Sequence, residues 1–157
     1  MEKFPITVNG EKKLRDELDN LTNIERPRII DDISVAREHG DLKENAEYHA
    51  AREQQSFVEG RIKDIKLKLS NAEIVDPNKI TSSKVVFSAK VKLYDFEKDC
   101  EISYSIVGDD EADIKSSLIS INSPIARSLI GKEEGDTVIA ETPSGGKEFE
   151  ILKISYE

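Results

Sequence analysis

The chain has one cysteine, Cys100, and no tryptophan among its 157 residues. A single cysteine cannot form an internal disulfide, which fits a protein of the reducing cytosol. Aromatic residues make up only 6% of the chain and there are two histidines, so a large aromatic ligand pocket is not expected and a His-rich metal site is excluded. No apolar run approaches about 18 residues, and none precedes a signal cleavage site. We therefore expect a cytoplasmic protein that does not contact a membrane.

Charged residues are abundant but predominantly acidic. The chain carries 23 Lys and Arg against 32 Asp and Glu, a formal net charge of −9. An acidic chain is repelled by nucleic-acid phosphates at long range and gains little from counterion release. Any contact with nucleic acid should therefore be local or depend on a protein partner. Hydrophobic residues make up 37% and charged residues 35% of the chain, which favours an extended helical hairpin over a single compact globule.

The N-terminal part carries apolar residues at helical spacing. We expect a helix that has Asn9 as N-cap, continues toward Glu38, and bends at Pro27, because a proline inside a helix removes one backbone hydrogen bond. Gly40 suits the left-handed conformation that ends a helix. The predicted apolar stripe comprises Leu14, Leu18, Leu21, Ile24, Ile30 and Ile33.

A second apolar pattern follows, with the alternating steps of four and three residues that are typical of a coiled coil. Asp76-Pro77-Asn78 should end this second helix. Because the connection between the two helices is short, they must fold back antiparallel and pack stripe against stripe. The predicted heptad positions are Ala51, Gln55, Val58, Ile62, Ile65, Leu69 and Ala72.

From Lys84 onward the period of the apolar residues changes to two, which predicts β-strands. Ser123 and Pro124 suit the N-cap and first position of a short helix that Gly131 ends. Gly145-Gly146 suits the turn between the last two strands. The predicted strands cover residues 85–93, 102–106, 137–141 and 149–156.

These patterns predict an α+β protein in two parts. The first part is an antiparallel coiled-coil hairpin over residues 1–76. A linker over residues 77–83 leads to a small antiparallel β-sheet domain with short helices over residues 84–157.

The predicted connection between the helices contains two carboxylates, Asp41 and Glu44. One interpretation is a capping box, in which Asp41 accepts a hydrogen bond from the Glu44 amide and Glu44 reaches back. The other is a binding site, because residues three apart at a helix start share a face and can converge on one point. Mg²⁺ is typically held by one or two carboxylates with substrate phosphates and waters. Two carboxylates make a poor isolated site, but at the end of a long arm they would complete a metal site of another molecule.

Arg37 and Arg52 lie on either side of this connection. Each is either a solvated helix residue, which is the common case for helical arginine, or a phosphate contact.

Several long runs of sequence resemble one family. GDLKENAEYHAAREQQ, followed by EGRIKDIKLKLSNAEIVD, is similar to the characteristic sequence of the Gre transcript cleavage factors, particularly their A type. IVGDDEAD and ISINSPIARSLIGKEEGD resemble the same family, so the resemblance covers nearly the whole chain.

The resemblance implies that the coiled coil enters the secondary channel of bacterial RNA polymerase, while an FKBP-like C-terminal domain docks on the channel rim. It implies that Asp41 and Glu44 help hold the second Mg²⁺ of the polymerase active site, which then hydrolyses the 3′ end of backtracked nascent RNA. The chain would be a monomer and no enzyme itself, with no cofactor of its own. The resemblance further assigns RNA contacts to Arg37 and Arg52, and polymerase contacts to Ser120, Asn122, Ser123 and Pro124.

Three alternatives stay open. A Gre-like inhibitor would share the shape and the docking but would not stimulate cleavage. A peptidyl-prolyl isomerase is suggested by the FKBP-like resemblance, but its pocket needs an aromatic lining. A plain coiled-coil adaptor would explain the heptads but not the run of sequence at the connection.

Overall fold

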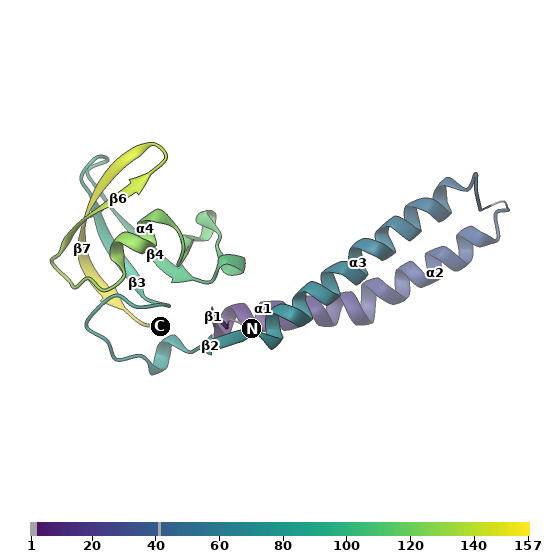
Figure 1. Ribbon diagram of the computed structural model, residues 1–157, viewed down its shortest axis with the longest axis horizontal. Helices are drawn as coiled ribbons and strands as arrows, with labels where there is room; N and C mark the ends of the chain where they lie inside the picture. Colours follow the sequence, from purple (N-terminus) through teal and green to yellow (C-terminus); the bar gives the residue numbers. More distant parts are fainter. Residues whose placement is uncertain (1–2, 41) are drawn as a thin grey trace. The chain divides into compact units, whose positions relative to one another are not determined.

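The computed structural model describes residues 3–40 and 42–157, and the chain forms two compact units (Figure 1). We call Glu11–Asn71 the arm. The described residues up to Gly10, together with Ala72–Glu157, form the sheet unit. The expected boundary near residue 76 thus falls at residue 71, and the N-terminal segment belongs with the C-terminal half of the chain.

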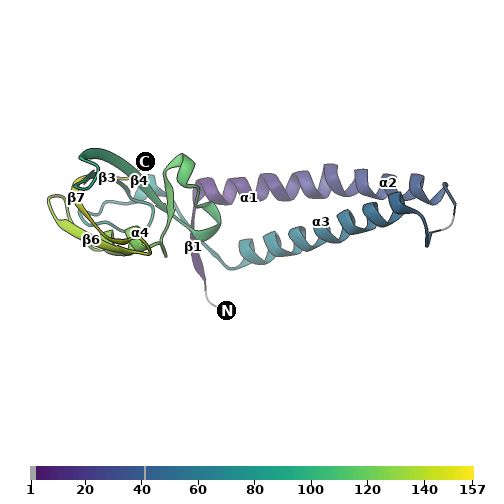
Figure 2. The same cartoon turned by 90° about the horizontal axis from the view of Figure 1, so that it is seen from above.

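The arm is an antiparallel helical hairpin, as predicted. Its first limb contains α1 (Val8–Asn20, which starts in the sheet unit), a π-helical segment (Leu21–Glu25) and α2 (Arg26–Arg37). Its second limb is α3 (Ala46–Ser70), and Figures 1 and 2 show α2 and α3 side by side. The 25 residues of α3 extend roughly 37 Å at the usual helical rise. No helix among the described residues is long and apolar enough to cross a membrane.

The bend expected at Pro27 is a π turn just before it. Arg26 N donates to Leu21 O, five residues earlier, where an α-helix would use the fourth. Such a turn holds one extra residue, so the buried face beyond it moves on by one position. A heptad continued from Leu14, Leu18 and Leu21 would bury residues 28, 32 and 35. The buried residues are instead Ile29, Ile33 and Ala36.

The prediction that Ile24 and Ile30 continue the apolar stripe is therefore wrong. They are 60% and 52% exposed. The position of Pro27 correctly predicted where the helix would depart from regular α-helical geometry. It did not predict that the apolar face would shift by one residue.

The heptad of α3 is confirmed as far as Leu69. Its buried members are Ala51, Val58, Ile62 and Ile65, while Gln55 and Leu69 are half-buried. The helix ends at Ser70, six residues before the expected stop, and Ala72 lies in a strand instead. Pro77 opens a short 3-10 turn.

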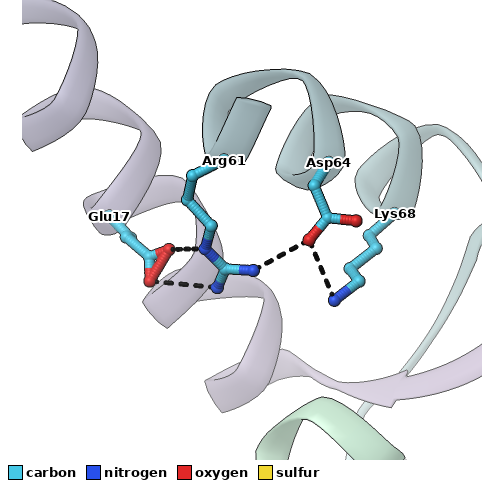
Figure 3. A network of polar contacts seen from close by, with 4 residues as sticks. All are labelled: Glu17, Arg61, Asp64 and Lys68. Atoms are coloured by element: carbon cyan, nitrogen blue, oxygen red, sulfur yellow. Dashed lines mark hydrogen bonds and ion pairs between the residues drawn. The ribbon is translucent and has the colours of Figure 1, made fainter. Parts of the chain in front are cut away.

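Ion pairs link the two limbs of the arm. Arg61 on α3 donates from Nε and Nη2 to the carboxylate of Glu17 on α1, at 2.7 and 3.1 Å. Figure 3 shows the same guanidinium reaching Asp64, whose carboxylate also pairs with Lys68. The hydrogen bonds with Glu17 raise the pKa of Arg61. Bidentate pairing of this kind fixes the register of the two limbs, although each exposed pair adds at most about 1 kcal/mol.

The sheet unit contains two sheets. In the smaller one, β1 (Phe4–Thr7) pairs in parallel with β2 (Ala72–Val75), two strands that the sequence patterns did not predict. The larger sheet has the order β5-β4-β3-β7-β6. Its strands are β3 (Lys90–Asp95), β4 (Cys100–Val107), β5 (Leu118–Ser120), β6 (Thr137–Thr142) and β7 (Gly145–Ser155).

The prediction of a wholly antiparallel sheet is corrected at one edge. β5 runs parallel to β4, because it returns after the irregular residues 108–117 rather than through a tight hairpin. The short helix is confirmed as α4 (Pro124–Leu129), with Ser123 as its N-cap and Gly131 at a φ of +83° after its end. The core of this unit includes Val85, Val91, Leu93, Ile106, Leu129, Phe149 and Ile151.

One carboxylate joins the N-terminal strand to the rest of the sheet unit. Glu111 accepts hydrogen bonds from Thr7 N at 3.0 Å, from the Thr7 hydroxyl, and from Gly108 N at 2.9 Å. The Thr7 hydroxyl in turn accepts from Gly10 N at 3.1 Å, where α1 begins. Thr7, and not the expected Asn9, therefore caps α1, which begins at Val8.

Two glycines of the helices should respond oppositely to alanine. A Cβ on Gly10 would lie 2.2 Å from Glu111 Cδ, so Gly10→Ala must displace a carboxylate held by three hydrogen bonds. We expect Gly10→Ala to lower the free energy of unfolding by about 1–3 kcal/mol. A Cβ on Gly60, inside α3, meets nothing within 4 Å, and Gly60→Ala should raise stability by about 0.5–1 kcal/mol through helix propensity. Urea unfolding of both variants measures this, and a stabilised Gly10→Ala would contradict the packing described here.

Candidate functional site

The tip of the arm is the turn between α2 and α3, and its geometry depends on Asn45. α2 ends at Arg37, and Gly40 follows with a φ of +115°, as expected for a glycine that ends a helix. Asn45 Oδ1 accepts from Tyr48 N at 3.0 Å and so caps α3. Asn45 Nδ2 donates to the carbonyl oxygen of Ala36. One amide therefore holds the end of α2 against the start of α3.

The capping-box interpretation is wrong, because the helix starts later than it requires. With Asn45 as N-cap, Glu44 precedes the helix and does not occupy its third position. Its carboxylate is exposed and forms no hydrogen bond or ion pair with the described residues. The argument that two helical carboxylates share a face fails for the same reason. Asp41, the other predicted site residue, lies outside the described residues.

Glu44 borders a hollow of about 470 Å³ at the tip. The rest of its lining consists of His39, Asn45, Ala46 and Glu47. His39 Nε2 lies 3.8 Å from a carboxylate oxygen of Glu47. These carboxylates lie beside the N-terminus of α3, where the helix dipole stabilises their negative charge. Within residues 3–40 and 42–157, no three His, Cys, Asp or Glu side chains form a metal-binding group. Glu44 can thus supply one ligand to a metal held elsewhere, but the described tip is not a complete metal site.

The arginines of the arm fall into two groups. Four of the six take part in ion pairs: Arg15 with Glu11, Arg26 with Glu59, Arg28 with Glu25 and Asp32, and Arg61 with Glu17 and Asp64. The other two are Arg37 and Arg52. Both are exposed, and neither forms an ion pair with any described residue. The two arginines expected to contact RNA are therefore the two of the arm that have no ion-pair partner among the described residues.

Arg37 has one contact that positions it. Its Cζ atom lies 5.9 Å from the centroid of the Tyr48 ring, within the range of a cation–π interaction. Tyr48 is half-buried and packs against the apolar core between α2 and α3. Tyr48 could not be assigned a role from the sequence, because its contact with Arg37 depends on how the two limbs pair.

The four predicted polymerase contacts lie together, from Ser120 at the end of β5, through the turn, to Pro124 at the start of α4. The Asp109 carboxylate accepts from the Ser120 hydroxyl and, at 3.0 Å, from Asn122 Nδ2. Asn122 N donates to Ser120 Oγ at 3.0 Å, and Ser123 Oγ accepts from Ala126 N at 3.3 Å. Their side chains thus hold the turn together. Asp109 was missed by the sequence analysis, since nothing local connects it to residues eleven and thirteen positions later.

Beside this turn is a hollow of about 340 Å³. Pro124, Arg127, Ser128, Ile139 and Glu141 line it, and none of them is aromatic. Phe149 lies in the core, while Phe87, Tyr104 and Tyr156 pack against it. The hollow therefore lacks the aromatic lining that a proline-isomerase pocket requires.

Two family models match the chain. The model described as "Transcription elongation factor, N-terminal" matches residues 4–74. The model described as "Transcription elongation factor, GreA/GreB, C-term" matches residues 80–156. Together the two matches cover nearly the whole chain.

Full-length relatives agree with the family models. The transcription elongation factors GreA of Alkalilimnicola ehrlichii and of Haemophilus influenzae are each 60% identical to this chain over 157 residues, with 99% of either chain covered. The crystal structure of GreA factor homolog 1 (Gfh1) of Thermus thermophilus covers 98% of this chain and 99% of its own at 23% identity, with a TM-score of 0.45. The sequence matches, rather than this structural likeness, establish the family.

The tip geometry predicts different stabilities for two neighbouring variants. Asn45→Ala removes both the cap of α3 and the bond to Ala36, so we expect a loss of about 1–2 kcal/mol in the free energy of unfolding. Glu44→Gln should change stability by less than about 0.5 kcal/mol, since the Glu44 side chain has no partner among the described residues. Urea unfolding distinguishes the two, and a large loss for Glu44→Gln would restore the capping box.

Proposed function

The chain belongs to the GreA/GreB family of transcription elongation factors, and from this premise we propose that it stimulates bacterial RNA polymerase to hydrolyse backtracked nascent RNA. In this proposal the arm enters the secondary channel of the polymerase and carries its tip to the active site. The polymerase performs the hydrolysis, which leaves a new RNA 3′ end. The chain itself is not the enzyme, because it contributes ligands and contacts to a site that belongs to its partner.

The placement of Glu44 is the observation that carries this proposal. Its carboxylate lies in the tip turn and is exposed. It forms no hydrogen bond or ion pair with the described residues that would have to be broken before it binds a metal ion. A second Mg²⁺, when bound in the polymerase, activates a water and stabilises the charge that develops on the cleaved phosphate. Glu44, with Asp41 three residues earlier in the sequence, would supply the carboxylate ligands that such an ion prefers.

Arg37 and Arg52 are proposed to hold the backtracked RNA. The chain has a net charge of −9, so it does not attract RNA over long distances. A few cations that form no ion pair with the described residues can still bind phosphate once a protein partner has brought the RNA close. The Tyr48 ring positions one of these cations.

Polymerase docking is proposed for the turn that contains Ser120, Asn122, Ser123 and Pro124. The hydrogen bonds from Ser120 and Asn122 to Asp109 support this assignment, because they give an exposed turn a defined shape before it binds. The exposed Ile139, at 61%, adds an apolar surface next to Pro124.

A Gre-like inhibitor is the second candidate function. It would dock in the same way, but its tip would not accelerate hydrolysis. The unpartnered Glu44 and the two unpaired arginines favour stimulation, because an inhibitor that only blocks the channel needs neither ligands for a metal nor contacts with the RNA 3′ end.

Replacing the tip carboxylates should remove the stimulation and leave the protein folded. We expect Asp41→Asn and Glu44→Gln each to lower the stimulated cleavage rate at least about tenfold, because each removes the charge of a metal ligand. Affinity for the polymerase should not change. The measurement is RNA shortening in a stalled, backtracked complex, with Glu38→Gln as the control for a nearby exposed acid. Wild-type rates from the double variant would contradict the metal-ligand role.

Replacing the unpaired arginines should weaken action on RNA rather than docking. Arg37→Ala and Arg52→Ala should each reduce cleavage stimulation equally across RNA sequences and make its salt dependence shallower by about one unit of slope. Arg15→Ala, which removes a paired arginine of the same arm, should leave the slope unchanged. Cleavage is measured against salt concentration, with affinity for free polymerase in parallel. If Arg37→Ala and Arg52→Ala both keep the wild-type salt slope and cleavage rate, these arginines are ordinary solvated residues.

A further inference from the structure

The arm has an apolar hollow that the proposed function does not use. Its volume is about 640 Å³, and it lies between the π-helical segment and α3. Phe57, on α3, is at its edge and is 75% exposed, the highest exposed fraction among the large hydrophobic residues that the structure leaves at the surface. The apolar part of the lining comprises Leu21, Ile29, Ala50, Phe57 and Val58.

The hollow is a consequence of the π turn before Pro27. The extra residue of this turn moves the buried face of α2 on to Ile29, while Leu21 stays half-buried on the other side of the turn. Facing it, α3 presents the small Ala50, whose methyl group does not fill the space. Phe57, one residue before the buried Val58 on α3, lies exposed beside the hollow.

The charges at the rim argue against a nucleic-acid ligand. Arg28, which lines the hollow, pairs with Glu25 at 2.7 Å, and the neighbouring Arg26 pairs with Glu59 at 2.7 Å. The hydrogen bond from Arg26 also lowers the pKa of Glu59. Glu53 is the lining charge that forms no ion pair with described residues, and it is an anion. The lining of the hollow therefore has no cation without an ion-pair partner that could bind a phosphate. It fits an apolar side chain of a protein, with a neutral or basic residue next to that side chain.

The size of the hollow argues against a second copy of this chain. Ten residues line it, whereas a stable protein interface uses about 20–30 residues on each side. A surface this small contributes to binding only when another contact holds the same two partners together, which raises the effective concentration for the second contact. The proposed docking of the sheet unit on the polymerase would provide that first contact.

We propose that the Phe57 hollow is a second docking site for RNA polymerase, which takes an apolar side chain of the channel wall next to a neutral or basic residue. This inference rests on the proposed function for the identity of the partner. Phe57 lies eleven residues along α3 from Ala46, about 16 Å from the start of the helix. The contact would hold the arm below the tip, so that Glu44, Arg37 and Arg52 could still make their proposed contacts with the metal ion and the RNA.

The test compares Phe57→Ala, the conservative Phe57→Leu, and Leu67→Ala as a matched control. Leu67 is also an exposed apolar residue of α3, at 52%, but it does not line the hollow. For each full-length variant, affinity for RNA polymerase and stimulated cleavage are measured over a range of protein concentrations. We expect Phe57→Ala to weaken affinity about tenfold, Phe57→Leu to recover most of it, and Leu67→Ala to stay within about twofold of wild type. The maximal cleavage rate at saturation should not change.

Unchanged affinity for Phe57→Ala would overturn the inference, as would a lower maximal rate at unchanged affinity. A wild-type dimer in sedimentation that Phe57→Ala converts to a monomer would also overturn it, in favour of a second copy. The proposed function fails separately: a wild type that binds polymerase through Phe57 but does not shorten RNA would refute cleavage stimulation and support the second docking site.

Discussion

The amide of Asn45 is the interaction on which the tip depends. It caps α3 through Tyr48 N and binds the Ala36 carbonyl in the last turn of α2. Because this one side chain satisfies backbone groups of both helices, no carboxylate is needed for the cap. Glu44 thereby lies in the turn before α3 and forms no hydrogen bond or ion pair with the described residues. In the proposed function the neutral amide of Asn45 fixes the turn, and the carboxylate of Glu44, one residue earlier, serves as a ligand in the polymerase.

Below the tip, the arm neutralises its own charge. Arg61 and Arg26 each bind a glutamate of the opposite limb with two hydrogen bonds, while Arg37 and Arg52 have no such partner among the described residues. A shaft of balanced charge has little affinity for RNA along its length. Under the proposed function, this distribution of charge limits phosphate contacts on the arm to Arg37 and Arg52. At the Phe57 hollow Arg28 is paired with Glu25, while Glu53 forms no ion pair with the described residues, and we therefore propose a protein rather than an RNA ligand there.

The parts of the fold that repeat along the chain could be predicted from the sequence, and the parts that depend on distant contacts could not. The heptad of α3 from Ala51 to Leu69 and the cap of α4 by Ser123 follow from local spacing. The pairing of β1 with β2 joins segments separated by the whole arm, and Asp109 acts on residues beyond the next turn. Pro27 indicated where the helix would deviate, but the one-residue shift of the buried face comes from the π turn in which Arg26 N donates to Leu21 O. Asp41 and Glu44 could be proposed as tip residues from the sequence. Only the structure shows why Glu44 takes no part in capping α3, because Asn45 occupies the N-cap position.

The Mg²⁺ dependence of RNA cleavage tests most directly whether the tip supplies carboxylate ligands to a metal ion of the polymerase. The rate is measured for a backtracked complex against Mg²⁺ concentration, without the chain, with wild type, and with Glu44→Gln. If the acids are ligands, wild type lowers the half-saturating Mg²⁺ concentration at least about tenfold and Glu44→Gln returns it toward the value of polymerase alone. The same half-saturating concentration in all three mixtures would show that the tip does not bind the metal.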